Sequence, residues 1–152
     1  MFTKFNLRNA TEQDLTEIAN LLNDDFLGKN REDLNCFNAY IDAFNEIQQH
    51  NNIQLLVLEN ENKKIIGTMQ LIMIPCLAVT GSKRMEIEAV RIASELRGSG
   101  IGSWMIEESI KIAKQHNCKI VQLSSNNQRI DAHKFYEKLG FDNSHVGMKL
   151  EI

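Results

Sequence analysis

The sequence predicts an α/β protein, described as α+β in some classification schemes, in which helices flank a mixed sheet. The first observation behind this prediction is that segments with strand periodicity alternate along the chain with segments of helical periodicity. The second is a glycine-rich segment, Arg97 to Gly102, at the junction of a predicted strand and a predicted helix. The third is the absence of repeats, linkers and low-complexity tracts, which predicts one domain over residues 1–152.

The N-terminal part of the chain contains one predicted strand and two predicted helices. Phe5 to Arg8 has the pattern of a short strand, and Thr11 followed by Asp14 forms a weak capping box that begins a helix. Gly28 ends this region. A second helix is predicted from Asp33 to Gln49, because its apolar residues recur at helical spacing.

Strands dominate the middle of the chain, and helices alternate with strands after it. The predicted segments are the strands Ile53–Leu58, Ile65–Ile74 and Met85–Ala93, the helix Ile101–His116, the strand Lys119–Leu123, the helix Asp131–Leu139 and a final strand His145–Ile152. The polar run from Glu59 to Lys64 predicts a hairpin turn, and Gly140 predicts a helix end. The predicted order is β-α-α-β-β-β-α-β-α-β-β.

Composition places the protein among ordinary globular chains. Of its residues 43% are hydrophobic and 24% charged, and the formal net charge is −3 without a basic stripe, so nucleic acid is not an expected partner. No apolar run reaches the length of a membrane span and no leader is visible, so a membrane is not expected either. The three cysteines, Cys36, Cys76 and Cys118, lack metal-binding or disulfide spacing, as do the four histidines. We therefore expect a cytoplasmic protein without a metal site.

The glycine-rich segment predicts an anion-binding turn. Its glycines permit a sharp backbone turn and close approach of a ligand, and the following helix start supplies unpaired N–H groups. Arg97 adds a cation at the rim. The segment lacks the Gly-Lys-Ser/Thr ending of a nucleotide-triphosphate loop, and its third glycine comes one position too early for a dinucleotide fingerprint. By itself it indicates a phosphate group, or a turn that serves only helix packing.

Two blocks of the sequence resemble one known superfamily. Arg97-x-x-Gly100-x-Gly102 after a strand resembles the Arg/Gln-x-x-Gly-x-Gly/Ala signature of the GNAT superfamily of N-acetyltransferases. Residues 132–141 resemble its carboxy-terminal Ala-x-x-Phe-Tyr-x-x-x-Gly-Phe block. The segments 87–91, 121–123 and 144–149 further resemble a group of small bacterial acetyltransferases. The resemblance implies a mixed, mostly antiparallel sheet of about six to seven strands with about four flanking helices.

The resemblance also implies a donor and a binding site. The donor would be acetyl-CoA, held between the splayed fourth and fifth strands, with its pyrophosphate on the glycine turn. The edge of the fourth strand would pair with the pantetheine amides. The residues implied for this site are Val90, Arg91, Ile92, Arg97, Gly98, Ser99, Gly100, Ile101, Gly102, Ser103, Asn126, Arg129, His133 and Tyr136. Many relatives have asparagine where this chain has Arg129, which puts their usual contact at that position in question.

Three residues are candidates for the chemistry of acetyl transfer. Glu86 and Glu88 project from the same face of their strand, a pattern that a half-exposed strand also explains. The resemblance implies that a glutamate here acts as the general base, often through water, with Glu88 ahead of Glu86. It also implies that Tyr136 is the general acid, although a tyrosine packed in the core is the alternative. Direct transfer in a ternary complex is expected, because no cysteine stands beside an obvious base.

The acceptor is left open by the sequence. A primary amine of a small molecule or of a protein is expected, and a domain of this fold that binds acetyl-CoA without catalysis is the alternative. Arg91 either lines the acceptor site and favours an acidic acceptor or points to solvent. His133 lies either on the helix surface or beside the CoA. A monomer and a homodimer are both open.

Overall fold

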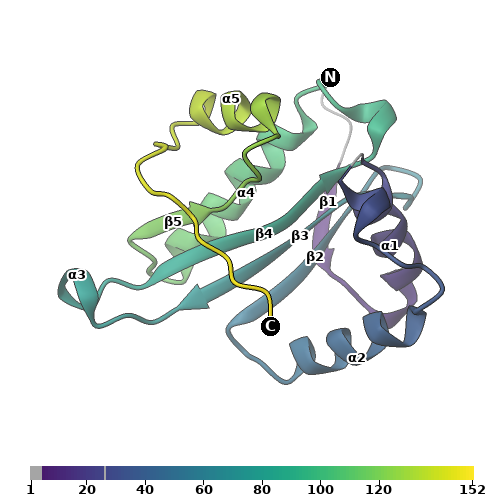
Figure 1. The fold of residues 1–152 in the computed structure, drawn as a ribbon, viewed down its shortest axis with the longest axis horizontal. Coiled ribbons are helices and arrows are strands. Elements are labelled where there is room, and N and C mark those ends of the chain that lie inside the picture. The colour runs from purple at the N-terminus through teal and green to yellow at the C-terminus, as the bar shows by residue number, and fades with distance from the viewer. Residues whose placement is uncertain (1–4, 26) are drawn as a thin grey trace.

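Helices cover both faces of a central sheet (Figure 1). The computed structural model describes residues 5–25 and 27–152. Its strands and longer helices are β1 (Asn6–Asn9), α1 (Leu15–Asn23), α2 (Phe37–Gln48), β2 (Ile53–Glu59), β3 (Ile65–Ile74), β4 (Arg84–Ile92), α4 (Ile101–Gln115), β5 (Ile120–Leu123) and α5 (Ile130–Lys138). They are connected in part by the 3-10 helices η1 (Glu12–Asp14), η2 (Gly28–Asn30) and η3 (Ser94–Leu96) and by the helical turn α3 (Ala78–Gly81).

The sheet has the strand order β1-β2-β3-β4-β5. Neighbouring strands are antiparallel from β1 to β4, whereas β4 and β5 are parallel. Parallel neighbours need a crossover connection, which α4 supplies. The structure thus confirms the α/β class and the mixed, mostly antiparallel sheet.

The predicted strands after α5 are not present. The sheet has five strands rather than six to seven, because residues 141–152 form no strand and pair with no edge within the described residues. The prediction for His145–Ile152 rested on alternation, which shows that a segment suits a sheet but not that an edge is available to it. The predicted helix from Asp33 also begins later, at Phe37, because the Asp33 carboxylate accepts the Asn35 N–H at 2.9 Å and holds a turn.

Each face of the sheet has its own apolar core. Residues of β2, β3 and β4 pack with α4 and α5 on one face, where Met105 and Ile106 are fully buried. The other face packs against α1 and α2 through residues that include Ile18 and Phe44. The two cores fix the helices on either side of β4, the strand on which the candidate site is built.

A bulge in β4 changes which residues face each core. Gln70 pairs with Glu88 and Thr68 with Arg91, so that β4 advances three residues while β3 advances two. The extra residue is accommodated at Ala89, whose φ is 54°. Ile87 before the bulge and Val90 and Ile92 after it all pack in the core that contains α4.

β4 and β5 separate after Ile87, just before the bulge. Their parallel ladder begins at Arg84 paired with Ile120 and ends at Ile87 paired with Leu123, whereas β4 continues to Ile92. The backbone edge of residues 88–92 that would face β5 is therefore left without a strand partner. This is the edge at which the resemblance implies pantetheine binding.

Candidate active site

The turn before α4 has the backbone conformation that a phosphate cradle requires. Gly98 and Gly100 have φ values of 77° and 89°, in the left-handed region that glycine favours. A Cβ atom built on either residue would meet no heavy atom within 4 Å, so the turn opens to solvent. Gly100 caps α4, whose first N–H groups have no partner inside the helix. These donors and the helix dipole would favour an anion at this turn.

Packing beneath the turn holds it in place. Ile101 is buried in the core below α4, and a Cβ on Gly102 would come within 3.4 Å of the Phe135 ring. That distance is an ordinary van der Waals contact, so α4 lies close to α5, the helix that carries Tyr136, and a small side chain would fit at position 102. The Ser99 hydroxyl donates to the Leu96 carbonyl at 2.5 Å and closes the turn on the other side.

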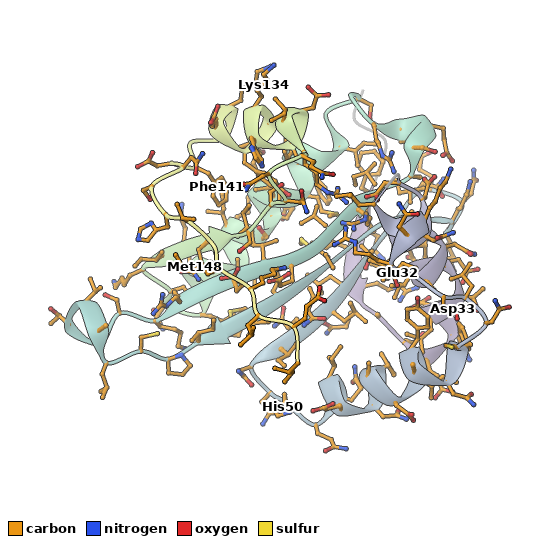
Figure 2. All side chains as sticks on the ribbon, viewed as in Figure 1. Glu32, Asp33, His50, Lys134, Phe141 and Met148 are labelled. Carbon is orange, nitrogen blue, oxygen red and sulfur yellow. The ribbon has the colours of Figure 1, made fainter. Side chains whose placement is uncertain are left out.

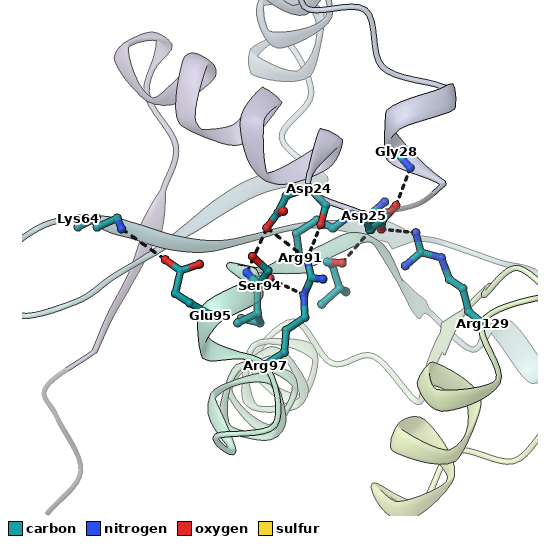
Figure 3. A network of polar contacts seen from close by, with 11 residues as sticks. Asp24, Asp25, Gly28, Lys64, Arg91, Ser94, Glu95, Arg97 and Arg129 are labelled. Atoms are coloured by element: carbon teal, nitrogen blue, oxygen red, sulfur yellow. Dashed lines mark hydrogen bonds and ion pairs between the residues drawn. The ribbon is translucent and has the colours of Figure 1, made fainter.

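Arg97 lies exposed at the rim of this turn, as predicted, but its guanidinium has protein partners. Its Nε donates to the Ile92 carbonyl at 3.0 Å and its Nη2 to the Asp24 carbonyl at 2.5 Å. The Asp24 carboxylate accepts the Ser94 N–H at 3.1 Å. Arg97 and Asp24 thus join the end of α1 to the segment that leads into the glycine turn (Figure 3).

Asp25 is the centre of a second, more buried network (Figure 3). One carboxylate oxygen accepts the Gly28 N–H at 2.5 Å, and the other lies 2.5 Å from Arg129 Nη2 and 3.4 Å from Arg91 Nε. Burial opposes ionisation of Asp25, but the Gly28 hydrogen bond and the two arginines hold the pKa of its carboxyl below the ordinary value. The network connects the α1–η2 junction to β4 and to the start of α5.

Arg91 is the least satisfied member of this network. Only 14% of its side chain is exposed, and its Nε is the one buried side-chain nitrogen or oxygen without a hydrogen bond among the described residues. Burial lowers the pKa of its guanidinium, and the charges of Arg129 and Arg31 act in the same direction. Asp25 and Glu32 oppose this shift, so three arginines and two acids act on one another's surroundings beside the separated end of β4.

Asp25→Asn tests the importance of this network for stability. Removing one carboxylate leaves two arginines, Arg91 and Arg129, without their shared partner, and we expect the free energy of unfolding to fall by about 3 kcal/mol at pH 7. Asp24→Asn is the matched control, since Asp24 is exposed and its ion pair with Arg97 should contribute about 0.5 kcal/mol.

The expected pH dependence follows from the lowered pKa of Asp25. The contribution of its carboxylate is present above the unfolded-state pKa, about 3.9, and is lost as the pH falls through the lower folded-state value. Denaturant titrations from pH 7 to pH 3 should show the difference between wild type and Asp25→Asn shrinking below about pH 4. A difference that is equally large at pH 3 would contradict the assignment.

Glu86 and Glu88 lie on the same side of β4 but in different surroundings. Glu86 accepts a hydrogen bond of 2.5 Å from Gln122 on β5. Glu88 has no such partner among the described residues and lies where β4 and β5 part. Desolvation and the neighbouring charge of Glu86 raise the pKa of the Glu88 carboxyl, while Lys149 of the C-terminal segment opposes the shift. Of the two, Glu88 is the better suited to accept a proton near neutral pH.

Tyr136 projects from α5 into an aromatic cluster. Its ring contacts Phe135 and Phe141 in edge-to-face geometry, with centroids 5.0 and 5.7 Å away. Burial raises the pKa of its phenol, and the charges of Arg91 and Arg129 oppose that shift. Within the described part of the chain its hydroxyl has no hydrogen-bond partner, so it is free to donate to a ligand.

Asn126, Arg129 and His133 form the turn that begins α5. The Asn126 carboxamide oxygen accepts the Gln128 N–H at 2.9 Å, and its backbone carbonyl accepts from His133 Nε2 at 3.0 Å. The His133 ring is therefore used in a local contact, and the Arg129 guanidinium is used by Asp25. Where relatives have asparagine, this chain has a residue that holds the α1–η2 junction.

The structure brings most of the predicted site residues to one end of β4. Ile101 of the glycine turn, Val90, Ile92 and Tyr136 all pack in one core, and Val90 and Ile92 belong to the part of β4 that no longer pairs with β5. Sequence reasoning missed Asp24, Asp25 and Lys149. Two adjacent acids at the end of a predicted helix, followed by Gly28, were the only signal for the aspartates. No sequence pattern indicated that Lys149 would lie near Glu88.

Comparisons with known proteins assign the family. A sequence model of the acetyltransferase (GNAT) family matches residues 15–141, which is most of the chain. This chain therefore belongs to the GNAT family of acetyltransferases. The comparison confirms the predicted superfamily.

No helix among the described residues is both long and apolar enough to cross a membrane, and the same residues contain no cluster of potential metal ligands.

Several individual proteins with more specific descriptions are similar to this chain. A crystal structure of a transcriptional regulator from Bacillus halodurans superposes with a TM-score of 0.93 and 40% identity, covering 98% of this chain and 100% of the other. The aminoalkylphosphonate N-acetyltransferase of Salmonella typhimurium is 35% identical over 60 residues, covering 40% of this chain and 39% of the relative. The glucosamine 6-phosphate N-acetyltransferase of Trypanosoma brucei brucei is 30% identical over 89 residues, with coverage of 59% and 58%. The chain thus spans at most 58% of the length of these two curated relatives.

Proposed function

We propose that the protein transfers the acetyl group of acetyl-CoA to a primary amine by direct attack within a ternary complex. The observation that carries this proposal is the glycine turn with left-handed Gly98 and Gly100, placed beside the unpaired edge of β4 in a GNAT-family fold. The turn would hold the pyrophosphate through its N–H groups. The β4 edge at Val90–Ile92 would pair with the pantetheine amides as an added strand.

The residues at the separation of β4 and β5 can supply the proton transfers. The amine nitrogen attacks the thioester carbon, the C–S bond breaks and CoA leaves as a thiolate. Glu88 accepts the proton that the attacking amine loses, directly or through a water molecule, and Tyr136 donates its phenolic proton to the departing sulfur. Backbone N–H groups of β4 stabilise the developing oxyanion. No metal is required for these steps.

Glu88→Gln tests the general base. We expect kcat/KM to fall about 100-fold, because an amide cannot accept the amine proton. The wild-type enzyme should show an acidic limb of kcat/KM above pH 4.5, since burial and Glu86 raise the pKa of Glu88, and this limb should disappear in the variant. A pH profile with saturating acetyl-CoA measures both effects.

Glu86→Gln is the control for this assignment. Removing the Glu86 charge should move the acidic limb to lower pH and leave the plateau rate in place, because that charge helps to raise the pKa of Glu88. Loss of the plateau in Glu86→Gln, with normal turnover in Glu88→Gln, would exchange the roles of the two carboxylates. Normal plateau rates in both Glu86→Gln and Glu88→Gln would exclude both carboxylates as the general base and leave water in that role.

The acceptor is proposed to be a small amine that also carries an anionic group. The charges of Arg31 and Arg129 act on Arg91, and they are opposed by Asp25 and by Glu32, which accepts a hydrogen bond from the Tyr40 hydroxyl at 2.6 Å. Three cations thus stand against two anions. The curated relatives named above act on an aminoalkylphosphonate and on a sugar phosphate, both anionic. A phosphate, phosphonate or carboxylate beside Arg91 would provide the partner that its Nε lacks.

A panel of paired amines tests the reaction and the acceptor class together. Free thiol release from acetyl-CoA is followed with each amine in its phosphorylated and unphosphorylated form. We expect turnover with anionic members and a preference for them over their neutral counterparts. Turnover with neutral amines only would retain the transferase activity and reject the anionic acceptor. Mass spectrometry of the products identifies the acetylated nitrogen.

The alternative is an acetyl-CoA-binding module with little catalysis. It is kept because the Bacillus halodurans relative, which matches over its whole length, is described as a transcriptional regulator. Acetyl-CoA should then raise the melting temperature while no amine accelerates thiol release. If neither CoA nor acetyl-CoA changes the melting temperature, both functions are rejected.

The single domain over residues 1–152 and the cytoplasmic location stay predictions from the sequence.

A further inference from the structure

The side of β4 that faces away from α4 carries two groups of opposite charge. Ile87, Val90 and Ile92 pack in the core that contains α4. Because side chains alternate along a strand on either side of the bulge, Glu88 and Arg91 project from the other side of the sheet. Glu88 is open to solvent, whereas only 14% of the Arg91 side chain is exposed. The strand thus presents a carboxylate and a guanidinium to one surface.

The bulge sets the spacing of these two groups. Gln70 of β3 pairs with Glu88 and Thr68 pairs with Arg91, so the two charged residues are as far apart as two positions of a regular strand. At about 3.4 Å per residue, their Cα atoms lie roughly 7 Å apart. Without the bulge, three regular positions would separate them by about 10 Å. The bulge therefore brings both charged groups within the reach of one small molecule.

Each of the two groups has room for a further hydrogen-bond partner. Among the described residues Glu88 accepts no hydrogen bond. Arg91 Nε lies 3.4 Å from the Asp25 carboxylate and makes no hydrogen bond to it. Arg91 Nη1 donates to the Val90 carbonyl at 2.9 Å, and within the same part of the chain Nη2 donates to no group. A ligand that carries both a donor and an anionic acceptor would complete both ends.

The neighbouring charges give this surface a negative and a positive end. Around Glu88 the acting charges are those of Glu86 and Lys149, so acids outnumber bases there. Figure 2 labels Met148, next to Lys149, on the C-terminal segment that crosses the view of β4. Around Arg91 bases outnumber acids. The charged residues that act on it are Asp25, Glu32, Arg31 and Arg129. The surface is therefore complementary to a ligand with a cation at one end and an anion at the other.

We infer that the acceptor is a linear ω-amino acid, a zwitterion whose amine and anionic group are separated by about three or four methylene groups. This inference rests on the proposed function, since Glu88 receives the amine and Arg91 the anionic group. In an α-amino acid both groups are bonded to one carbon, and bonds of about 1.5 Å place the nitrogen only about 2.5 Å from the carboxyl carbon. Each further methylene group adds about 1.3 Å, so three or four are needed to span most of roughly 7 Å.

A ligand held in this way presents its amine to the general base. The amine nitrogen bonds to the acetyl carbon, the C–S bond breaks, Glu88 accepts the amine proton and Tyr136 protonates the departing thiolate. Arg91 takes no part in these bond changes. It is a specificity-determining residue that fixes the distance from the anionic group to the reacting nitrogen.

A chain-length series tests the spacing in the wild-type protein. Thiol release from saturating acetyl-CoA is measured with linear ω-amino carboxylates that contain from one to six methylene groups, and with n-alkylamines of matched length. We expect kcat/KM to peak at three or four methylene groups, and at the peak to exceed that of the matched n-alkylamine by about 10- to 100-fold. ω-Aminoalkylphosphonates should peak at the same length. A flat profile, or a peak at one methylene group, would overturn the spacing and leave the transferase function standing.

Arg91→Met tests the residue that holds the anionic group. The preference for the ω-amino carboxylate over the matched n-alkylamine should fall by about 10-fold or more, mainly through KM. Arg91→Lys restores a cation and should recover part of this preference at the same chain length. Both variants should keep a cooperative thermal transition, because Asp25 retains its contacts with Arg129 and Gly28.

Arg84→Met is the matched control. Arg84 lies on β4 on the opposite side of Glu88 along the strand, and its Nη1 donates to Gln122 at 3.3 Å. This variant should retain the wild-type length profile. A profile that is unchanged in Arg91→Met, or flattened in Arg84→Met, would place the anionic group elsewhere. Absence of turnover with every amine would reject the proposed function and this inference with it.

Discussion

Gly100→Val is expected to abolish acetyl-CoA binding while leaving a folded protein. Gly100 has a φ of 89°, and a β-branched residue held in the left-handed region costs about 1–2 kcal/mol. A Cβ there would meet no protein atom within 4 Å, so it would project into the space that the ligand needs. The loss of two charge-assisted hydrogen bonds to the pyrophosphate would weaken binding roughly 100-fold or more. Isothermal titration with acetyl-CoA measures this.

Gly140→Val separates the ligand effect from the backbone effect. Gly140 follows α5, has a φ of 91° and has equally open surroundings, but it lies outside the glycine turn. Both variants should lose a similar amount of stability, a decrease in Tm of about 3–6 °C. Only Gly100→Val should lose acetyl-CoA affinity. If Gly100→Val binds acetyl-CoA as tightly as Gly140→Val, the cradle lies elsewhere.

Tyr136→Phe is expected to reduce kcat about 100-fold with little change in the dissociation constant for acetyl-CoA. The substitution keeps the ring and its contacts with Phe135 and Phe141, and it removes only the hydroxyl that would protonate the leaving sulfur. Burial raises the pKa of Tyr136, so the wild-type phenol should stay protonated at neutral pH, and the alkaline limb of kcat should begin above pH 10. That limb should be absent from the variant.

Tyr40→Phe is the matched control for this substitution. Tyr40 lies on α2 and donates to Glu32 at 2.6 Å, so its loss should cost about 1 kcal/mol of stability and leave kcat unchanged. Stopped-flow measurement of thiol release in both variants separates chemistry from acetyl-CoA binding. An unchanged kcat in Tyr136→Phe would remove its role as general acid and leave a packing role.

The features that could be predicted from the sequence are local ones. The glycine turn, the capping pair at Thr11 and Asp14 and the hairpin after Glu59 each depend on residues within a few positions of one another. In the structure the Thr11 N–H donates to the Asp14 carboxylate at 2.7 Å, and Asn60 side-chain and backbone groups hold the hairpin. Short-range chemistry of this kind can be recognised from neighbouring residues, without knowledge of any tertiary contact.

The features that could not be predicted depend on distant residues. Asp25 and Arg129 are 104 positions apart, and no local pattern indicates that α5 returns to the end of α1. The direction of Arg91 also escaped prediction, because strand alternation counted from Glu88 places position 91 on the apolar side. The prediction of a final strand over His145–Ile152 was wrong for a related reason. Alternation of polar and apolar residues is a property of the segment alone, and it does not show which sheet edge is available for pairing.

The bulge at Ala89 has a consequence for how this family member can change its substrate. By shifting the frame of β4 by one position, it lets Glu88 and Arg91 share the side of the sheet opposite to the core that holds Ile87, Val90 and Ile92. A substitution at position 91 can therefore change the charge on that side of the sheet without disturbing this core. If the bulge were flattened with no residue removed, regular alternation from Ile87 would instead turn Arg91 inward and Ile92 outward. The position of Arg91 therefore depends on residue 89 staying outside the regular strand pairing.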